Sequence, residues 1–572
     1  MMRICSLKTV TPRTMGTRAA GRFGSRGSLV LLVLAAFAAV GLVSCSAAGS
    51  GQPAHISASA SASPSAAGAG LAGPATTSVG RDGVQSSAII AENHRPGTSS
   101  WRITNPGAGV VEGFADHNYA QQGDVVGLYI STNQPSFIAA AYRMGWYGGV
   151  GARKVWQSPV IRGKIQSACP VDVSTNMVSC ANWTRSLTVT VTSAFVPGDY
   201  LIKLTSSDNS QSYVMLTVWQ PDSHAAYLVM NRSMVEQGWN TFGGFDFYQG
   251  QGSCILDKSG YPPCNRARVV SFDRPYVGDG TNDFMDSEYP MVKFMEEKGL
   301  DVTYCTDICI SEHPGFLLQH KSLVDTDHDE TWTNSEREGV LKAAATGVNM
   351  AFFGAATLVR HARLEPSPLG ADRVEVDYRN SAEDPLNHGT DPLEVTGNQW
   401  TSPPASWNPE SFIGQVYSGY LWPNEPSAPM KVFDANSWLF QGTGLTGGAE
   451  IPSVINSDIE HLNPSGPMPK NLQVLAHSPI PLSHVFTAEG KWNGDTYSDV
   501  TYYTNSSGAG VFDSGDNIWV STLQPCPAST PSCSAPIMRE LTGNVLRLFG
   551  QGPAGKKEPS HSNWQTVTPP GS

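Results

Sequence analysis

The sequence predicts a multidomain β plus α/β protein, with an N-terminal antiparallel β-sandwich at residues 96–222 and an α/β domain with a mostly parallel sheet at residues 223–550. Three observations predict this architecture. Period-two alternation dominates the first region, apolar strands alternate with helical segments in the second, and a low-complexity stretch precedes both. With 572 residues, the chain is long enough for two or three domains.

Residues 1–44 have the order of an export signal. A basic leader precedes an apolar run at 29–43, and Cys45 follows Ser44. The run of about 15 residues is shorter than the ~20 that a membrane span needs. A Cys directly after a small residue resembles the bacterial lipobox, in which the thiol is acylated and the Cys becomes the mature N-terminus. We therefore expect Cys45 to be lipidated and to anchor the protein on the extracytoplasmic face of the membrane. The alternatives are an uncleaved signal anchor and a free Cys at this position.

Residues 45–95 have the composition of a linker. Positions 46–80 are mostly Ser, Ala and Gly with almost no charge, so this segment is expected to behave as a flexible coil. Residues 551–572 are expected to form a flexible tail.

The cysteines fall into close pairs. The chain has ten Cys, of which Cys5 lies in the signal and Cys45 is the expected lipid site. An even number of locally paired Cys on an exported chain predicts disulfides. A metal cluster is the alternative, but no pair has C-x-x-C spacing. The expected disulfides are Cys169–Cys180, Cys254–Cys264, Cys305–Cys309 and Cys526–Cys533.

The charge balance bears on possible partners. The net charge of −12 includes the basic leader, so the exported part is more acidic still. A nucleic-acid partner would need a basic stripe, and none is expected here. The expected partners are the membrane, through Cys45, and a small-molecule ligand.

The predicted strands of the first region are short and separated by turn residues such as those at 122–124 and 197–199. They lie at 125–130, 137–142, 187–191, 200–204 and 213–218.

The second region alternates strands and helices, which predicts a parallel sheet that is covered on both faces. Ser335 and Glu338 form an expected capping box for a helix through Ala345, and Glu288 is expected to cap another helix. The predicted strands are 226–230, 301–304, 348–354, 511–515 and 518–520, and the other helices are 288–298 and 542–549. Ligands of such sheets bind beyond the carboxyl ends of the strands, which here are followed by 231–233, 305–307, 327–332 and 355–361.

Several stretches carry a resemblance to a known family. They are 111–115, 142–149, 238–244, 270–276, 287–290, 328–332 and 442–445. Because these stretches occur in the same order as in that family, the chain resembles the large (beta) subunit of N,N-dimethylformamidase and its actinobacterial relatives. The resemblance implies a β-sandwich followed by a domain similar to glutamine amidotransferases. It also implies hydrolysis of a small amide C–N bond with a mononuclear iron, held by two tyrosinates and a carboxylate.

The chain departs from that family at the iron ligands. Thr331 and Val359 occupy the two positions where relatives have Tyr, and only a carboxylate, Asp458, remains at the third. Val cannot ligate a metal and Thr is a poor ligand, so the tyrosinate iron site is not expected here.

Other residues at the predicted sheet edge could supply a site instead. His and carboxylate side chains could hold Zn²⁺ or Fe²⁺ with an open position for water, whose pKa the metal would lower towards ~7. The expected metal ligands are His328, His361 and Asp458, and His328 and Glu330 are the expected catalytic pair. Glu460 and His461 lie in the same predicted region. The alternative for each residue is a hydrogen bond to backbone groups at a βα turn.

Two functions therefore remain open on sequence alone. The first is a lipid-anchored hydrolase of a small amide C–N bond. The second is a catalytically silent cell-surface protein that binds a ligand on the same fold. No Gly-x-Ser-x-Gly elbow is present for a serine hydrolase.

Overall fold

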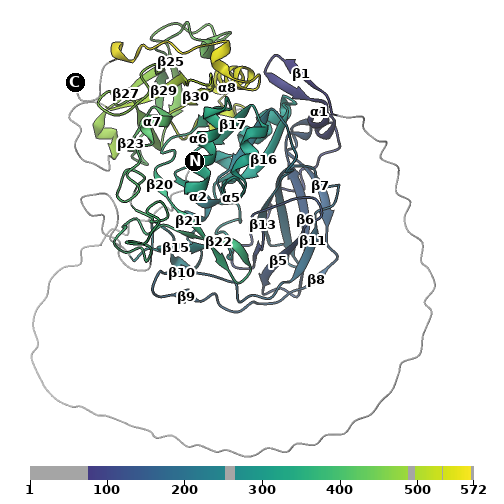
Figure 1. The fold of residues 1–572 in the computed structure, drawn as a ribbon. Helices are drawn as coiled ribbons and strands as arrows, with labels where there is room; N and C mark the ends of the chain where they lie inside the picture. Colours follow the sequence, from purple (N-terminus) through teal and green to yellow (C-terminus); the bar gives the residue numbers. More distant parts are fainter. Residues whose placement is uncertain are drawn as a thin grey trace, which may run out of the picture. The chain divides into compact units, whose positions relative to one another are not determined.

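The computed structural model describes residues 75–250, 265–397, 399–486, 496–527, 529–530 and 532–567. The leader, Cys45 and the pair Cys254/Cys264 lie outside these residues. The described part is a mixed, β-rich molecule with several open sheets and a few short helices (Figure 1). None of its helices is long and apolar enough to cross a membrane.

The expected linker ends earlier than residue 95. A hairpin of β1 (Thr77–Gly80) and β2 (Gly83–Ser86) leads into α1 (Ser87–Asn93). The Tyr227 hydroxyl accepts a hydrogen bond from the Val84 N–H at 3.0 Å. Residues 77–93 are therefore folded against the α/β part, and only the stretch before them keeps the expected linker assignment.

Two sheets in the N-terminal region share one apolar core. Alternate residues of β5 and β12 point into it, among them Val126, Leu128 and Ile202. All five strands predicted in this region are present. The three-stranded sheet has the order β11-β5-β3 and the larger sheet the order β4-β13-β12-β6-β7, with β8 also paired to β6. Their bounds are β3 Val111–Ala115, β4 Tyr119–Ala120, β5 Val125–Thr132, β6 Ser136–Met144, β7 Ala152–Gln157, β8 Ile161–Arg162, β11 Leu187–Thr190, β12 Gly198–Ser206 and β13 Gln211–Val218.

A seven-stranded sheet organises the second region, in the order β16-β14-β17-β19-β30-β29-β27. The first five strands are parallel, and β29 and β27 are antiparallel to their neighbours. The strands are β14 Tyr227–Asn231, β16 Val302–Thr306, β17 Ser322–Thr326, β19 Asn349–Phe353, β27 Gln473–Ile480, β29 Thr496–Thr504 and β30 Gly510–Asp513.

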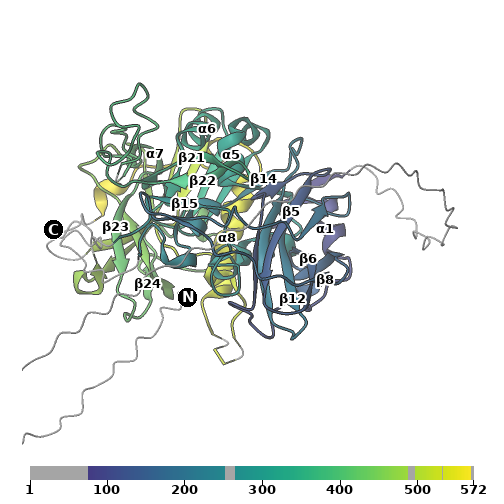
Figure 2. The same ribbon diagram turned by 90° about the horizontal axis from the view of Figure 1, so that it is seen from below.

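Both faces of this sheet are covered. Tyr227 and Val229 belong to a core shared with α4 (Tyr289–Glu297) and α8 (Ala535–Phe549), whereas Leu228 and Met230 belong to a second core on the other face. The second core includes residues of α5 (Asp307–Glu312) and α6 (Asn334–Ala345), and Figure 2 shows α5 and α6 on the side of the sheet away from α8. The near-continuous apolar β14 is explained by this double burial.

The remaining elements are short. The further helices are α2 Ser233–Gly238, α3 Phe284–Ser287 and α7 Glu410–Ile413. The further strands are β9 Val171–Asp172, β10 Met177–Val178, β15 Val269–Ser271, β18 Thr331–Trp332, β20 Arg360–His361, β21 Arg363–Ser367, β22 Gly370–Val376, β23 Val416–Leu421, β24 Ala428–Lys431, β25 Glu450–Ile455, β26 Asp458–His461 and β28 Val485–Phe486.

The helix starts differ from those expected. The capping box of α6 is formed by Thr333 and Glu336, because the Thr333 Oγ1 accepts the Glu336 N–H at 3.1 Å. Ser335 instead donates to the Ser311 carbonyl at 2.7 Å. Glu288 precedes α4 without a side-chain cap, and its carboxylate accepts from Asn231 at 2.7 Å.

Two C-terminal expectations were wrong. Residues 518–520 form a turn rather than a strand, because the Asp516 carboxylate accepts the Ile518 N–H at 2.8 Å and bends the chain. The expected tail is packed through residue 567, where Asn563 exchanges hydrogen bonds with the Val474 backbone at 2.7 and 3.0 Å.

Three of the four predicted disulfides lie in the described part of the chain, and all three are formed. Their Cα atoms are 4.5 Å apart for Cys169–Cys180, 5.7 Å for Cys305–Cys309 and 5.5 Å for Cys526–Cys533. These are ordinary separations for a disulfide.

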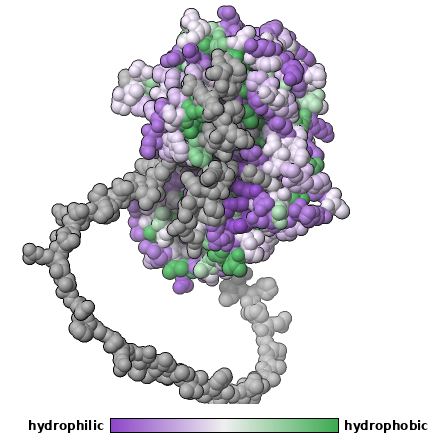
Figure 3. Space-filling model, turned by 90° about the vertical axis from the view of Figure 1, so that its left-hand side faces the viewer, coloured by the Kyte–Doolittle hydropathy of each residue, from purple (hydrophilic) through white to green (hydrophobic). Residues whose placement is uncertain are grey.

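The surface carries apolar side chains only in small groups on the face shown in Figure 3. The exposed large apolar residues of the described chain include Val160, Ile165 and Val173. Scattered exposed residues of this kind are normal on a folded protein.

A buried ion pair joins the two regions. Arg143 of β6 donates to Glu296 of α4 through Nη2 at 2.6 Å and Nη1 at 3.0 Å, and both side chains are fully buried. Tyr304 also donates to Glu296 at 2.9 Å. Removing one partner of such a pair leaves an uncompensated buried charge.

We therefore expect Glu296→Leu to lower the free energy of unfolding by about 3–5 kcal/mol, measured by urea denaturation. The double variant Arg143→Met/Glu296→Leu should recover much of this loss. The control Glu540→Ala breaks the exposed pair with Arg81 and should cost less than about 1 kcal/mol. Equal losses for Glu296→Leu and Glu540→Ala would contradict this account.

Candidate functional site

The carboxyl ends of the parallel strands carry the residues that the sequence singled out. The loop after β17 contains His328 and Glu330, and the segment after β19 begins at Gly354. These two segments approach so closely that a Cβ atom at Gly354 would collide with the Asp327 carbonyl oxygen. Only glycine fits at this position, which brings the β17 and β19 loops together.

His328 lies between two carboxylates. Its Nδ1 is 3.1 Å from Asp458 Oδ2, and its Nε2 is 3.4 Å from Glu330 Oε2. All three side chains are largely buried, with exposed fractions of 14 %, 14 % and 7 % for His328, Asp458 and Glu330. The structure therefore brings together both predicted catalytic residues, His328 and Glu330, and two of the three predicted metal ligands, His328 and Asp458.

Asp458 is held by several donors. It accepts hydrogen bonds from the Tyr417 hydroxyl at 2.7 Å, from Asn517 Nδ2 at 2.9 Å and from Ser457 Oγ at 3.2 Å. Burial would raise the pKa of Asp458, but His328 and these hydroxyl groups outweigh burial and hold that pKa below its ordinary value. Asp458 is thus an ionised acceptor beside the imidazole.

Glu330 has the opposite character. Burial raises the pKa of Glu330, and the nearby Arg360 guanidinium, with Nε at 3.6 Å, only partly opposes this effect. The pKa values of the two carboxyl groups beside His328 are therefore shifted in opposite directions. Such a divergence is the usual mark of separate proton-donating and charge-stabilising roles.

Arg232 supports the loop that carries His328. Its Nη1 donates to the His328 carbonyl at 3.1 Å, and its Nη2 lies 3.7 Å from Asp327. Burial opposes the charge of Arg232, but Asp327, Glu236 and Glu288 outweigh it and raise the pKa of this guanidinium. Arg232 is consequently a fixed positive charge behind the site.

His361 does not join this cluster. In β20 it is paired with Trp332 of β18, and its ring stacks on Trp400 at a centroid distance of 3.9 Å. Burial lowers the pKa of His361 to about 4, which keeps the ring neutral near pH 7. The expectation that His361 contributes to a site with His328 and Asp458 was wrong, because β20 carries it into the aromatic core.

Glu460 and His461 are also directed elsewhere. Glu460 accepts the Thr357 N–H at 3.0 Å, and burial together with Asp513 raises its pKa. His461 pairs with Ser418, and burial lowers its pKa to about 4. Among the described residues, no group of three or more His, Cys, Asp or Glu side chains is arranged to hold a metal ion.

Sequence reasoning missed Tyr417 and Asn517. Asn517 follows β30, which runs parallel to β19, so the rule about carboxyl ends would have pointed to it. Tyr417 lies on β23, an antiparallel strand beside β26, and no sequence signal marks it.

The residues at the aligned iron-ligand positions do not fit a two-tyrosinate iron. Thr331 is buried in β18, and Val359 contributes its carbonyl to a hydrogen bond with the Trp400 N–H at 3.1 Å. The phenol beside Asp458 belongs to Tyr417, at a different position of the chain.

The chain was compared with known proteins. No curated protein matches. One solved structure, of an uncharacterized protein from Bacillus anthracis str. Ames, is 14 % identical over 18 % of this chain and 82 % of that one, and its TM-score of 0.12 supports no conclusion. Residues 138–533 match the family described as N,N-dimethylformamidase beta subunit-like, C-terminal, and this span includes His328, Glu330 and Asp458. The chain therefore belongs to the N,N-dimethylformamidase beta subunit-like family.

Proposed function

We propose that this protein hydrolyses a small amide C–N bond and that His328 is its general base. The observation that carries the proposal is the His328 imidazole between Asp458, whose pKa is lowered, and Glu330, whose pKa is raised. Family membership supports the choice of a small amide as the substrate class.

Each residue has a distinct role in this reaction. Asp458 accepts the His328 Nδ1–H and so orients Nε2 towards the substrate. Nε2 removes a proton from water as the water oxygen bonds to the amide carbon. Glu330, whose pKa burial raises, donates a proton to the leaving nitrogen as the C–N bond breaks, and the imidazolium returns its proton to Glu330.

This sequence of steps uses no metal. The predicted site for Zn²⁺ or Fe²⁺ included His361, which is stacked on Trp400. His328 Nδ1 is already engaged by Asp458 at 3.1 Å.

Architecture and location are parts of the same proposal. We infer that the two N-terminal sheets form a β-sandwich domain and that the seven-stranded sheet forms a glutamine-amidotransferase-like α/β domain. The shared core of the first sheets and the double burial of the second support this inference. The lipobox at Cys45 supports anchoring on the extracytoplasmic face of the membrane.

The hydrolase proposal is tested with His328→Gln, Asp458→Asn and Glu330→Gln in the full-length chain. We expect each to lower kcat/KM for formamide, N-methylformamide or N,N-dimethylformamide by about 10²–10⁴-fold, measured by amine release. Wild-type activity should fall as pH rises through the Glu330 pKa, because Glu330 must be protonated, and Glu330→Gln should lack this alkaline decline.

The control is His117→Gln, which alters a His–Asp pair, with Asp116 at 2.6 Å, outside the site. It should retain wild-type turnover. Binding of these amides without turnover by the wild type would instead favour the ligand-binding scaffold.

We also expect the purified protein to lack a tyrosinate-to-iron charge-transfer band after growth with iron. The reason is that Thr331 and Val359 stand where the family has its Tyr ligands. Visible absorption and metal analysis of the full-length chain check this. A purple or amber colour would contradict this prediction and would indicate the tyrosinate iron chemistry of the family.

The anchor is tested by Cys45→Ala. We expect this variant to move from the membrane pellet to the soluble fraction, because the acyl chains supply the membrane affinity. Replacing the neighbouring Ser46 by Ala is the control and should leave the protein in the pellet. A Cys45→Ala protein that still pellets would contradict lipidation.

A further inference from the structure

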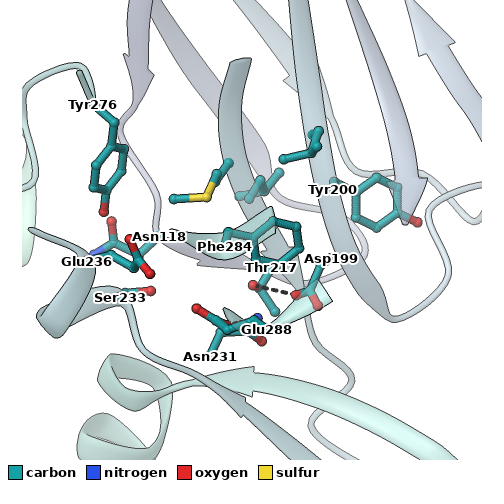
Figure 4. Close-up of a pocket in the computed structure, with 13 residues that line it drawn as sticks. Asn118, Asp199, Tyr200, Thr217, Asn231, Ser233, Glu236, Tyr276, Phe284 and Glu288 are labelled. Atoms are coloured by element: carbon teal, nitrogen blue, oxygen red, sulfur yellow. Dashed lines mark hydrogen bonds between the residues drawn. The ribbon is translucent and has the colours of Figure 1, made fainter. Parts of the chain in front are cut away.

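A cavity outside the His328 site lies between the six-stranded sheet and the carboxyl end of β14. Its cavity volume, counted as the space open to the centres of water-sized molecules, is about 60 Å³. Figure 4 shows polar side chains from both regions converging on it. Its polar lining includes Asp199, Thr217, Asn231, Ser233, Glu236 and Glu288, and its apolar lining includes Leu201, Met215, Leu216 and Phe284.

Two hydrogen-bond acceptors in this cavity lack a partner. Asp199 Oδ1 accepts from the Thr217 hydroxyl at 3.0 Å, and the Asn231 amide also lies close enough to lower the Asp199 pKa, but no group completes a hydrogen bond to Asp199 Oδ2. Asn231 Nδ2 donates to Glu288 at 2.7 Å, and Asn231 Oδ1 has no partner. Asp199 and Asn231 are only 3 % and 6 % exposed. Leaving a buried acceptor without a hydrogen bond costs free energy. A ligand that brings N–H donors into the cavity would remove this cost.

The charge balance of the lining is also incomplete. The single guanidinium of Arg232 forms ion pairs with Glu236 at 3.1 Å, with Glu288 at 3.6 Å and with Asp327 at 3.7 Å. Burial raises the pKa of Glu288 to about 8 and that of Asp199 to about 6, in the latter case against the opposing effect of Thr217 and Asn231. The lining therefore carries more carboxyl groups than Arg232 alone can neutralise.

The apolar part of the cavity lining suits a short hydrocarbon group. Met215 lies two residues before Thr217 on β13 and opposite Leu201 of β12, so both side chains share the sheet face of Asp199. Leu201 and Phe284 are buried there. An inorganic cation would leave this apolar wall unused.

We propose that this cavity binds a small primary alkylammonium ion. The N–H groups donate to Asp199 Oδ2 and Asn231 Oδ1, the positive charge offsets the surplus of carboxylates, and the alkyl group packs against Met215 and Leu201. This site is separate from His328, and its occupation does not depend on the proposed hydrolysis.

The test is calorimetric titration of the full-length chain with n-propylammonium chloride. We expect saturable binding of n-propylammonium, and none of n-propanol or tetramethylammonium, which lack the charge or the N–H donors. Asp199→Asn should weaken binding at least tenfold. The control Asp246→Asn changes another buried carboxyl group, which lies outside the cavity, and should bind as the wild type does.

A second pair of variants tests the site in a way that does not depend on whether Asp199→Asn folds. Met215→Lys places a tethered ammonium at the cavity wall, so its Tm should exceed that of Met215→Leu, and it should no longer bind n-propylammonium. A Tm of Met215→Lys below that of Met215→Leu would overturn the proposal. So would equal binding of n-propanol, binding of Mg²⁺ in place of n-propylammonium, or no binding of n-propylammonium.

Discussion

The buried guanidinium of Arg232 is the constraint on which the sheet edge depends. It lies within 3.1–3.7 Å of three carboxylates, those of Glu236, Glu288 and Asp327, and it also holds the His328 carbonyl. Charges buried without a counter-ion are costly, so Arg232 lowers the cost of keeping these three carboxyl groups at the edge. The same side chain thereby fixes the lining of the alkylammonium cavity and the backbone of the His328 loop. The two sites are chemically different, but they share one electrostatic support.

Behind His328, the carboxyl edge holds more acidic groups than cations. Asp307, Asp325, Asp329 and Glu336 are all buried, and burial raises the pKa of each. Repulsion from neighbouring carboxylates of this group adds to the rise for Asp307, Asp329 and Glu336. The folded state therefore binds more protons than the unfolded chain above the ordinary carboxyl pKa of ~4. Their contribution to stability is present below that pKa and is lost as pH rises through their raised folded-state values. This accumulation of like charge is a cost of concentrating acidic residues where the strands end.

The sequence predicted the sheet regions well because their apolar periods are local. The strand at 226–230 and the helix at 288–298 were placed within one or two residues of β14 and α4. It predicted the meeting of His328 with Asp458 only by combining the rule for parallel strands with the family resemblance. It misplaced His361, because a two-residue bridge with Trp332 and a stack on Trp400 are tertiary contacts without a periodic signal. Tyr417 was missed for the same reason, since only the long-range pairing of β23 with β26 brings it to Asp458.

The hairpin of β1 and β2 enters the α/β part at the amino ends of its strands. The Val84 carbonyl accepts a hydrogen bond from the Asp301 N–H at 2.8 Å, directly before β16. The Val84 N–H donates to the hydroxyl of Tyr227, the first residue of β14. His328 lies past the opposite ends of the same strands. The hairpin and the His328 edge are thus separated by the full length of the parallel strands. A support coupled at the hairpin itself, on a sensor chip or a bead, would therefore meet the molecule at the amino ends of these strands and not at the His328 edge.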